Sequence, residues 1–562
     1  MKKQLFKIGL TLSLVSALGM TTACTSNSSN QPQNGNQTEP SEKVNMSLTD
    51  PMSKYDPPIE VTTIRAVSNI KFDEGETIDK NAVYDAYEKE LGIKIKNSWV
   101  SDKYTEKLKI SIASNDIPDF FRVSANELQQ LQEADMIADV TDIFDKYASQ
   151  KTKEWFHLDG GRQLSTATFN NRLMAFPATD NPYNSSSYLW IRKDWLEKLG
   201  LPKPQTMQDV MMIAEEFAKK DPGGAGKTYA FALNSDYIAG GAYDLQGFFN
   251  GYHAYPGKWV KDASGKLVYG TVMPEMKQAL KQLQDMYKAG MIDPEFAVKD
   301  ADKENELVVA GKIGMAYGAF WQSIWPLQSA AVQNGKLAQD WEAYPIVSID
   351  GKPAKTATDI GTSNYFVVSK KAKHPEAVMK MINKWIDVQT NLTDANKVYM
   401  FGKSGVDKSA LLWKINPTVF FAQDENLPAG KLLPKAIEAK DPTLLGSNPE
   451  INSRYRRVEK YLAGDLSMWN EWAISKPGGS FAIMDQYDRE KRYQIDEFYG
   501  TLTPAMLEKK GILEEKAKEA FTKIIMNNVS VDEFDKFVVE WKKLGGEQMT
   551  KEANDWYAKT KK

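Results

Sequence analysis

The chain has 562 residues, of which 74 are acidic and 71 are basic, so its formal net charge is −3. This balance lacks the basic footprint of a nucleic-acid-binding protein, and the length allows two or more domains. The single cysteine excludes an intramolecular disulfide and a cysteine-based metal site. Beyond the first residues, no stretch has the ~18 apolar residues that a membrane-spanning helix requires.

Residues 1–23 have the three parts of a secretory signal peptide. Lysines come first, an apolar stretch follows from Ile8 to Met20, and small residues precede Cys24. This stretch resembles a bacterial lipoprotein leader, which implies that the Cys24 thiol is lipidated and that Cys24 begins the mature chain. Thr21 departs from the pattern, where Leu, Val or Ile is preferred. The alternative is an ordinary signal peptide with an incidental cysteine. Two acyl chains anchor stably, so we expect a protein tethered to the extracellular face of the cell membrane.

Residues 24–57 are expected to be a lipidated cysteine followed by a disordered tether. The segment is rich in Asn, Gln, Ser and Pro. With few large apolar side chains, it cannot offset its chain entropy by burial. The folded body then begins with a strand at residues 59–64.

The first part of the body alternates strands and helices. Apolar residues at helical spacing over residues 83–91 predict a helix that Gly92 ends. A strand at residues 93–95, a helix at 104–112 and a buried strand at 117–123 follow. This order predicts a parallel sheet with right-handed crossovers.

Ligands on such sheets gather at the carboxyl ends of the strands. The rule draws attention to residues 69–72, after the first strand, and to residues 124–126, after the third, including Asn126. Polar residues in these loops are equally suited to capping helices.

Further elements follow from local patterns. Residues 259–269 read as a hairpin, and residues 276–287 as a helix that Gly290 ends. Residues 530–533 have the sequence of a capping box, before an apolar stripe that runs from residue 534 to 544. We expect that last helix to pack on the body rather than lie on a membrane surface.

Several segments follow the pattern of one known family in both order and spacing. They are Tyr104–Leu108, Ile112–Asp119, Tyr188–Pro202, Tyr365–Lys370, His374–Ala377, Phe498–Thr501, Trp541–Gly546 and Trp556–Tyr557. The chain resembles the extracellular solute-binding proteins of ABC importers (solute-binding protein family 1) over nearly the whole mature sequence. Its C-terminal segments look like the large Gram-positive lipoprotein branch, which is linked to carbohydrate uptake.

The resemblance implies an α/β fold, a two-lobed periplasmic-binding-protein-like (type II) clamshell. Its discontinuous lobes are joined by hinge strands, with the ligand in the cleft between them. We expect residues 58–180 to begin lobe 1, residues 181–361 to form lobe 2, and residues 362–400 to return to lobe 1. Residues 401–562 would then be a C-terminal helical part that completes both lobes.

The hinge crossings supply the first ligand-binding candidates. One crossing is expected near residues 180–188, because a turn-like segment precedes a strand there, and another near residues 362–365. Amides and carboxylates suit the recognition of hydroxyl groups. The candidates are Tyr183, Asn184, Asn364 and Tyr365, with Asp180, Asn126 and Tyr243 as further ones.

Aromatic pairs supply the second set of candidates. Trp321 and Trp325 follow a short apolar strand, and their spacing would place both indoles on one helical face, where they can floor a sugar cleft. Trp469 and Trp472, three residues apart, precede a Gly-containing loop. For both pairs the competing interpretation is packing in a core.

One apparent metal site is discounted. Residues 221–226 keep the first Asp and the turn Gly of a calcium-binding loop, but Gly223 and Ala225 offer no side-chain oxygen. The three histidines lie far apart in the sequence. We therefore expect no metal and no cofactor.

Together these patterns favour a lipid-anchored, monomeric binding protein that captures an oligosaccharide and delivers it to an ABC permease. It would be neither an enzyme nor a nucleic-acid-binding protein. One alternative is a secreted polysaccharide-active glycosidase, which needs two carboxylates flanking one bond. The other is the same fold with a peptide or another solute as ligand. The nucleophile-elbow, zinc-protease and phosphate-loop motifs do not occur in the sequence.

Overall fold

The structure is a computed structural model that describes residues 50–66, 72–238, 241–362, 364–403, 412–446 and 448–560. The signal peptide, Cys24 and most of the tether therefore lie outside the described residues, as does most of the loop at 69–72. Within the described ranges no helix is both long enough and apolar enough to cross a membrane.

The packed body begins before the first strand, inside the segment expected to be tether. Tyr55 is buried, and its hydroxyl donates a 2.8 Å hydrogen bond to Glu376. A Cβ at Gly92 would come within 2.3 Å of the Tyr55 carbonyl oxygen, and Gly92 has φ 65°. Gly92 therefore ends the first helix, as predicted, and also admits the Tyr55 backbone.

The predicted alternation of strands and helices is present in the first part of the body. Strands β1 and β2 pair in parallel. The third strand, β3, instead joins an antiparallel sheet in the order β3-β17-β6, and Thr62 ties the two sheets together through the Asp119 carboxylate. The elements are β1 (Ile59–Ala66), α1 (Ala82–Leu91), β2 (Ile93–Ser101), α2 (Tyr104–Ala113), β3 (Phe120–Val123), α3 (Ala125–Glu133), α4 (Thr141–Tyr147), α5 (Gln150–Phe156), α6 (Arg162–Ser165), β4 (Thr168–Phe169), β5 (Arg172–Leu173) and β6 (Phe176–Pro177).

The middle of the chain forms a separate five-stranded sheet in the order β15-β7-β12-β8, with β9 also paired to β12. The predicted helix and hairpin are both present, as α10 and as β10 with β11. The elements are β7 (Tyr188–Arg192), α7 (Lys193–Leu199), α8 (Met207–Lys220), β8 (Tyr229–Phe231), β9 (Ala242–Asp244), α9 (Gln246–Gly251), β10 (Trp259–Lys261), β11 (Leu267–Tyr269), α10 (Glu275–Lys288), α11 (Ala301–Val309), β12 (Ile313–Gly318), α12 (Leu327–Ala331), β13 (Val332–Gln333), β14 (Lys336–Leu337), β15 (Trp341–Tyr344) and β16 (Thr356–Thr358).

The last part of the chain first returns to the sheet of β3 and β6. It then adds helices beside the five-stranded sheet of the middle part. Strand β17 completes the sheet of β3 and β6, whereas β18 pairs in parallel with β16. The elements are β17 (Tyr365–Val368), α13 (Glu376–Thr390), α14 (Val398–Phe401), α15 (Leu427–Ala439), α16 (Pro449–Leu462), α17 (Trp469–Ser475), α18 (Ser480–Arg489), β18 (Tyr493–Ile495), α19 (Pro504–Ile525), α20 (Glu533–Trp541) and α21 (Glu547–Thr560).

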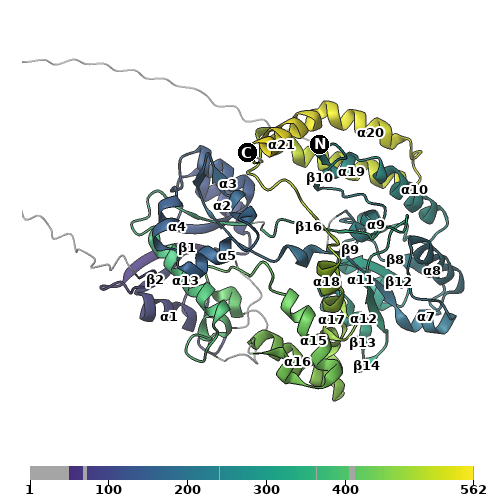
Figure 1. The fold of residues 1–562 in the computed structure, drawn as a ribbon, viewed down its shortest axis with the longest axis horizontal. Coiled ribbons are helices and arrows are strands. Elements are labelled where there is room, and N and C mark those ends of the chain that lie inside the picture. Colours follow the sequence, from purple (N-terminus) through teal and green to yellow (C-terminus); the bar gives the residue numbers. More distant parts are fainter. Residues whose placement is uncertain are drawn as a thin grey trace, which may run out of the picture. The chain divides into compact units, whose positions relative to one another are not determined.

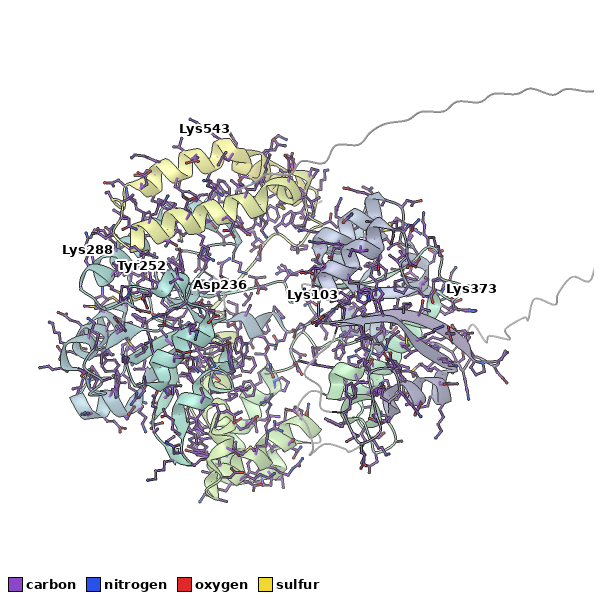
Figure 2. The ribbon with its side chains drawn as sticks, turned by 180° about the vertical axis from the view of Figure 1, so that it is seen from behind. Lys103, Asp236, Tyr252, Lys288, Lys373 and Lys543 are labelled. Atoms are coloured by element: carbon purple, nitrogen blue, oxygen red, sulfur yellow. The ribbon has the colours of Figure 1, made fainter. Side chains whose placement is uncertain are left out.

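A large apolar core joins the middle of the chain to its C-terminal helices. Its buried residues come from positions 188–354 and again from 427–553. Figure 1 shows α19, α20 and α21 gathered beside α10. Figure 2 labels Asp236, whose carboxylate forms a 3.1 Å ion pair with Lys518 of α19.

The predicted capping box at residues 530–533 is wrong. The Ser530 hydroxyl donates to the Asp532 side chain, and Asp532, not Ser530, precedes α20. Most of the apolar stripe is nevertheless buried, because Phe534, Phe537 and Trp541 pack into the core, whereas Leu544 at its end is 40% exposed.

Candidate ligand-binding cavity

A cavity of about 870 Å³, here called the main cavity, is lined by segments from distant parts of the sequence. Its floor comes from residues 178–185 and 359–364. Its walls come from the end of β1, the start of α2, strand β3 and residues 414–421. Volumes of this order are typical of ligand sites.

Three chain segments cross side by side at the floor of the main cavity. The Ala178 amide donates to the Asn364 carbonyl at 2.9 Å, and the Asp180 amide donates to the Gly361 carbonyl at 2.7 Å. The Phe421 amide donates to the Thr179 carbonyl at 2.8 Å. The segments in which the crossings are predicted, near residues 180–188 and 362–365, are thus hydrogen-bonded to each other, and residue 421 is bonded beside them.

Gly361 is the residue that allows the first two crossings to approach. It has φ 83°, and a Cβ there would come within 2.5 Å of the Asp180 carbonyl oxygen. Any larger residue would both strain the backbone and collide with that oxygen.

The polar side chains at the floor form hydrogen bonds with one another. The Asp180 carboxylate accepts hydrogen bonds from the Asn181 amide at 2.7 Å and from the Asn184 side chain at 3.4 Å. Asn184 in turn accepts a 2.7 Å bond from the Asn426 side chain. Burial raises the pKa of Asp180 above its usual range. The floor can therefore offer a pre-positioned set of amide and carboxylate groups to hydroxyls.

One wall of the main cavity carries positive charge. It contains Arg65, Tyr104, Arg122 and Lys414, which are called the basic wall below. The Arg65 guanidinium donates to the carbonyls of Lys414 at 2.6 Å and Ile415 at 2.8 Å. The Tyr104 hydroxyl donates to the Arg122 carbonyl at 2.7 Å. Lys103, labelled in Figure 2, marks the residue just before α2 and Tyr104.

Two further carboxylates line the main cavity, Asp359 in the floor and Asp496 just after β18, the strand that pairs with β16. Asp359 forms an ion pair with Lys258, and its backbone amide donates to the Ser185 hydroxyl at 3.0 Å. Asp496 accepts from the backbone amides of Trp259 and Phe498. Burial raises the pKa of Asp496 to about 6, against the opposing effect of the Lys258 charge.

The structure brings three of the predicted site residues together in the main cavity: Asp180, Asn184 and Asn364. Tyr183 lies beside them in the sequence, and its ring stacks on Tyr493 at 4.3 Å between centroids. Tyr365 belongs to β17, directly after Asn364, and is buried.

The remaining predicted residues lie apart from the main cavity. Asn126 is exposed on α3, whereas Tyr243 is fully buried and donates to Asn305 at 2.8 Å. Trp469 is in the core, and Trp472 stacks on Tyr461. Tyr243, Trp469 and Trp472 therefore serve the packing of the fold in the positions that they occupy.

Trp321 and Trp325 do lie next to each other, as their spacing predicts. Their rings stack with centroids 6.3 Å apart and planes 23° apart. Trp325 is 45% exposed and lines a different groove of about 620 Å³, the tryptophan groove, together with Ile324, Pro326, Val332 and Leu466. Trp321 is partly buried against the core.

The sequence patterns missed most of the residues that form the walls. Arg65 and Arg122 lie at or near the ends of β1 and β3, so the strand-end rule pointed to the correct edges but to positions slightly too late in the sequence. Phe366, Phe421 and Asn416 line the main cavity because the chain returns there, and no local pattern marks them.

The discounted calcium-like loop is a hydrogen-bonded turn. The Asp221 carboxylate accepts a 2.7 Å bond from the Thr228 hydroxyl and a 2.9 Å bond from the Gly226 amide. Those donors lower the pKa of Asp221, with Thr228 contributing most.

Comparison with known proteins identifies the fold and the family. LipO, a lipoprotein of Bacillus subtilis, is 24% identical over 493 residues, which are 86% of this chain and 90% of LipO. FusA of Streptococcus pneumoniae, a fructooligosaccharide ABC transporter substrate-binding protein, is 25% identical over 54% of this chain and 56% of FusA.

Solved structures match over nearly the whole chain. An EF-hand mutant of FusA in complex with fructo-nystose aligns with a TM-score of 0.60 at 17% identity, covering 90% of this chain and 99% of FusA. A human-milk-oligosaccharide-binding solute-binding protein of Bifidobacterium longum infantis aligns with a TM-score of 0.59 at 15% identity, covering 89% and 98%. The chain has the same two-lobed type II fold.

The model of the bacterial extracellular solute-binding protein family matches residues 72–389, more than half of the sequence. These residues include strands from both main sheets and two of the three segments that cross at the cavity floor. The chain therefore belongs to the bacterial extracellular solute-binding protein family.

Proposed function

We propose that this protein captures an oligosaccharide outside the cell and delivers it to an ABC permease. The observation that carries the proposal is the main cavity, whose floor is made by the crossing segments of a two-lobed fold. The oligosaccharides bound by FusA and by the Bifidobacterium protein support this ligand class.

The chemistry of the lining also suits a sugar. Hydroxyls can pair with the amides and carboxylates of Asp180, Asn184 and Asn364, while the rings of Tyr104, Phe366 and Phe421 offer apolar faces. We therefore assign ligand contact first to these residues. The tryptophan groove is a second place where a long ligand would find an exposed indole.

We propose that the protein is a carrier and not a glycosidase. A glycosidase needs one carboxyl group that is free to protonate the leaving oxygen and another that is free to attack or activate water. In the main cavity Asp359 is paired with Lys258, and Asp180 and Asp496 each accept backbone hydrogen bonds. This arrangement favours holding a ligand over cleaving it.

The attachment to the membrane is part of the same proposal. The N-terminal sequence and the similarity to the lipoprotein LipO support a lipid on Cys24. The tether that follows would let the folded body reach a permease. We place the lobe boundaries at the crossings, near residues 180, 362 and 421.

Calorimetry of the mature protein against a panel of plant and microbial oligosaccharides tests the proposal. We expect at least one oligosaccharide to bind, with no release of reducing ends during prolonged incubation. Release of reducing ends would favour the glycosidase alternative. Binding of peptides but of no oligosaccharide would keep the fold and replace the ligand class.

A further inference from the structure

The charges around the main cavity are separated. The three cationic side chains of the lining, Arg65, Arg122 and Lys414, all belong to the basic wall. The three carboxylates, Asp180, Asp359 and Asp496, belong instead to the floor and to the ends of the paired strands β16 and β18. A ligand in the main cavity therefore meets cationic groups and hydrogen-bond acceptors that come from different segments of the lining.

The carboxylates of the lining do not pair with the two arginines of the basic wall. Asp359 is paired with Lys258, and the Asp180 carboxylate is bonded to Asn181 and Asn184. Asp496 accepts two backbone amides. Neither Arg65 nor Arg122 forms an ion pair with a carboxylate in the part of the chain that the structure describes.

The two arginines share the basic wall with Tyr104. All three residues line the main cavity, and the Tyr104 hydroxyl donates to the Arg122 carbonyl at 2.7 Å. The Arg65 guanidinium already has its hydrogen-bond partners. It donates to three backbone carbonyls of the loop at residues 414–416 and to the Tyr84 hydroxyl, and so holds that loop in place.

The Arg122 side chain, by contrast, makes no such hydrogen bonds among the described residues. Arg122 is the exposed residue of β3, between buried neighbours, and it stands opposite Phe366 of β17 in the sheet. A guanidinium presents paired N–H donors that match a carboxylate in two parallel hydrogen bonds.

We propose that the ligand is an acidic oligosaccharide, whose uronate carboxylate is bound by Arg122 on the basic wall. This inference rests on the proposed function and narrows its ligand class. The sugar hydroxyls would lie toward the floor and the carboxylates of the lining, which accept hydrogen bonds. Arg65 acts as a positioning residue that fixes the loop beside the bound carboxylate.

The experiment compares ligands that differ only in charge. Trisaccharides of galacturonate, glucuronate and mannuronate are titrated beside their methyl esters and beside neutral trisaccharides. We expect at least one uronate to bind about tenfold or more tightly than its ester, as a charge-assisted bidentate pair would give. That preference should shrink as salt concentration rises.

Substitutions test whether Arg122 causes the preference for the uronate over its methyl ester. Arg122→Gln should remove it while changing the affinity for the ester by less than about twofold, and Arg122→Lys should keep part of it, since the charge remains but the paired geometry is lost. Arg456→Gln, at an exposed site on α16 outside the main cavity, is the control for net charge. Because the Arg122 side chain is exposed, we expect the thermal midpoints of these variants to stay at that of the wild type.

Each outcome has a distinct meaning. If neutral trisaccharides bind but uronates do not bind better than their esters, the inference fails and the proposed function stands. If Arg122→Gln keeps the full preference, the assignment to Arg122 is wrong. If no sugar of any kind binds, the proposed function fails together with the inference.

Discussion

The side-chain amide of Asn426 donates a 2.7 Å hydrogen bond to the side-chain oxygen of Asn184, which lies 242 residues earlier in the sequence. Asn184 also reaches back to the Asp180 carboxylate. Through these two bonds the first crossing at the cavity floor is joined to the residue that precedes α15. The turn that presents Asn184 to the main cavity is thus held from both sides.

A double-mutant cycle tests this link. Asn426→Ala should lower the free energy of unfolding by about 1–3 kcal/mol, since it leaves a partly buried acceptor without its donor. Combined with Asn184→Ala, the two changes should be non-additive by about 0.5 kcal/mol or more in urea titrations. Strictly additive losses would show that the bond makes no net contribution to stability.

Glu304 predicts how stability depends on pH. Its side chain is fully buried, and burial raises its pKa from 4.5 to about 8. Between pH 4.5 and about pH 8, the Glu304 carboxyl group has lost its proton in the unfolded chain but keeps it in the folded chain. The Glu304 contribution to stability is therefore complete below about pH 4.5 and falls by about 1.4 kcal/mol per pH unit up to about pH 8.

Glu304→Gln should remove that slope. The amide oxygen can still accept the 3.1 Å bond from the Leu233 backbone, and no proton has to be retained. Compared with the wild type, the variant should gain about 2–3 kcal/mol between about pH 5 and pH 7.5 in urea unfolding. Glu306→Gln, two positions further on the exposed face, is the matched control. Parallel pH profiles for wild type and Glu304→Gln would contradict the raised pKa.

The tryptophan groove predicts a separation of stability from binding. Trp325→Ala should keep the thermal midpoint, because the side chain is 45% exposed, whereas Trp321→Ala should lower it. If an indole contacts the ligand, as the sequence led us to expect, Trp325→Ala should weaken sugar binding by about 1–3 kcal/mol. Unchanged calorimetric affinity would confine the ligand to the main cavity.

Cys24 predicts where the protein is found. Replacing it by Ser removes the thiol that would carry the lipid, so the protein should move from the membrane fraction to the medium. Immunoblots of both fractions, with mass spectrometry to identify any unprocessed precursor, provide the measurement. A fully processed variant that stays in the membrane fraction would argue against lipidation.

The crossing segments predict a conformational response. If a ligand bridges the two lobes, closure about the crossings should reduce the radius of gyration measured by small-angle scattering. Gly361→Ala should impair that response, since a Cβ would collide with the Asp180 carbonyl. An identical scattering profile at verified saturation would contradict closure.

Sequence patterns predicted the local elements well where one stretch of chain decides the structure. Helix α10 follows from its apolar spacing, and its end follows from Gly290 with φ 69°. The hairpin of β10 and β11 follows from its turn. At residue 530 the same kind of inference failed, because the Ser530 hydroxyl found a nearer partner in Asp532.

Long-range pairing could not be predicted in the same way. Strand β3 has the composition of a buried strand, but nothing in it reveals that its neighbour is β17 and not β1. The same limit applies to the main cavity. Asp180, Asn184 and Asn364 were expected near a hinge and do line the main cavity, whereas Arg65, Arg122 and Phe421 reach it only through the tertiary fold.

The position of β17 between β3 and β6 has a consequence for how the chain is made. Both outer strands are synthesised long before the strand that joins them. Until residue 368 has emerged, β3 and β6 have exposed edges that can pair with other chains. The sheet of β3, β17 and β6 is therefore completed late. Correct folding requires that the edges of β3 and β6 stay unpaired with other chains until β17 has been made.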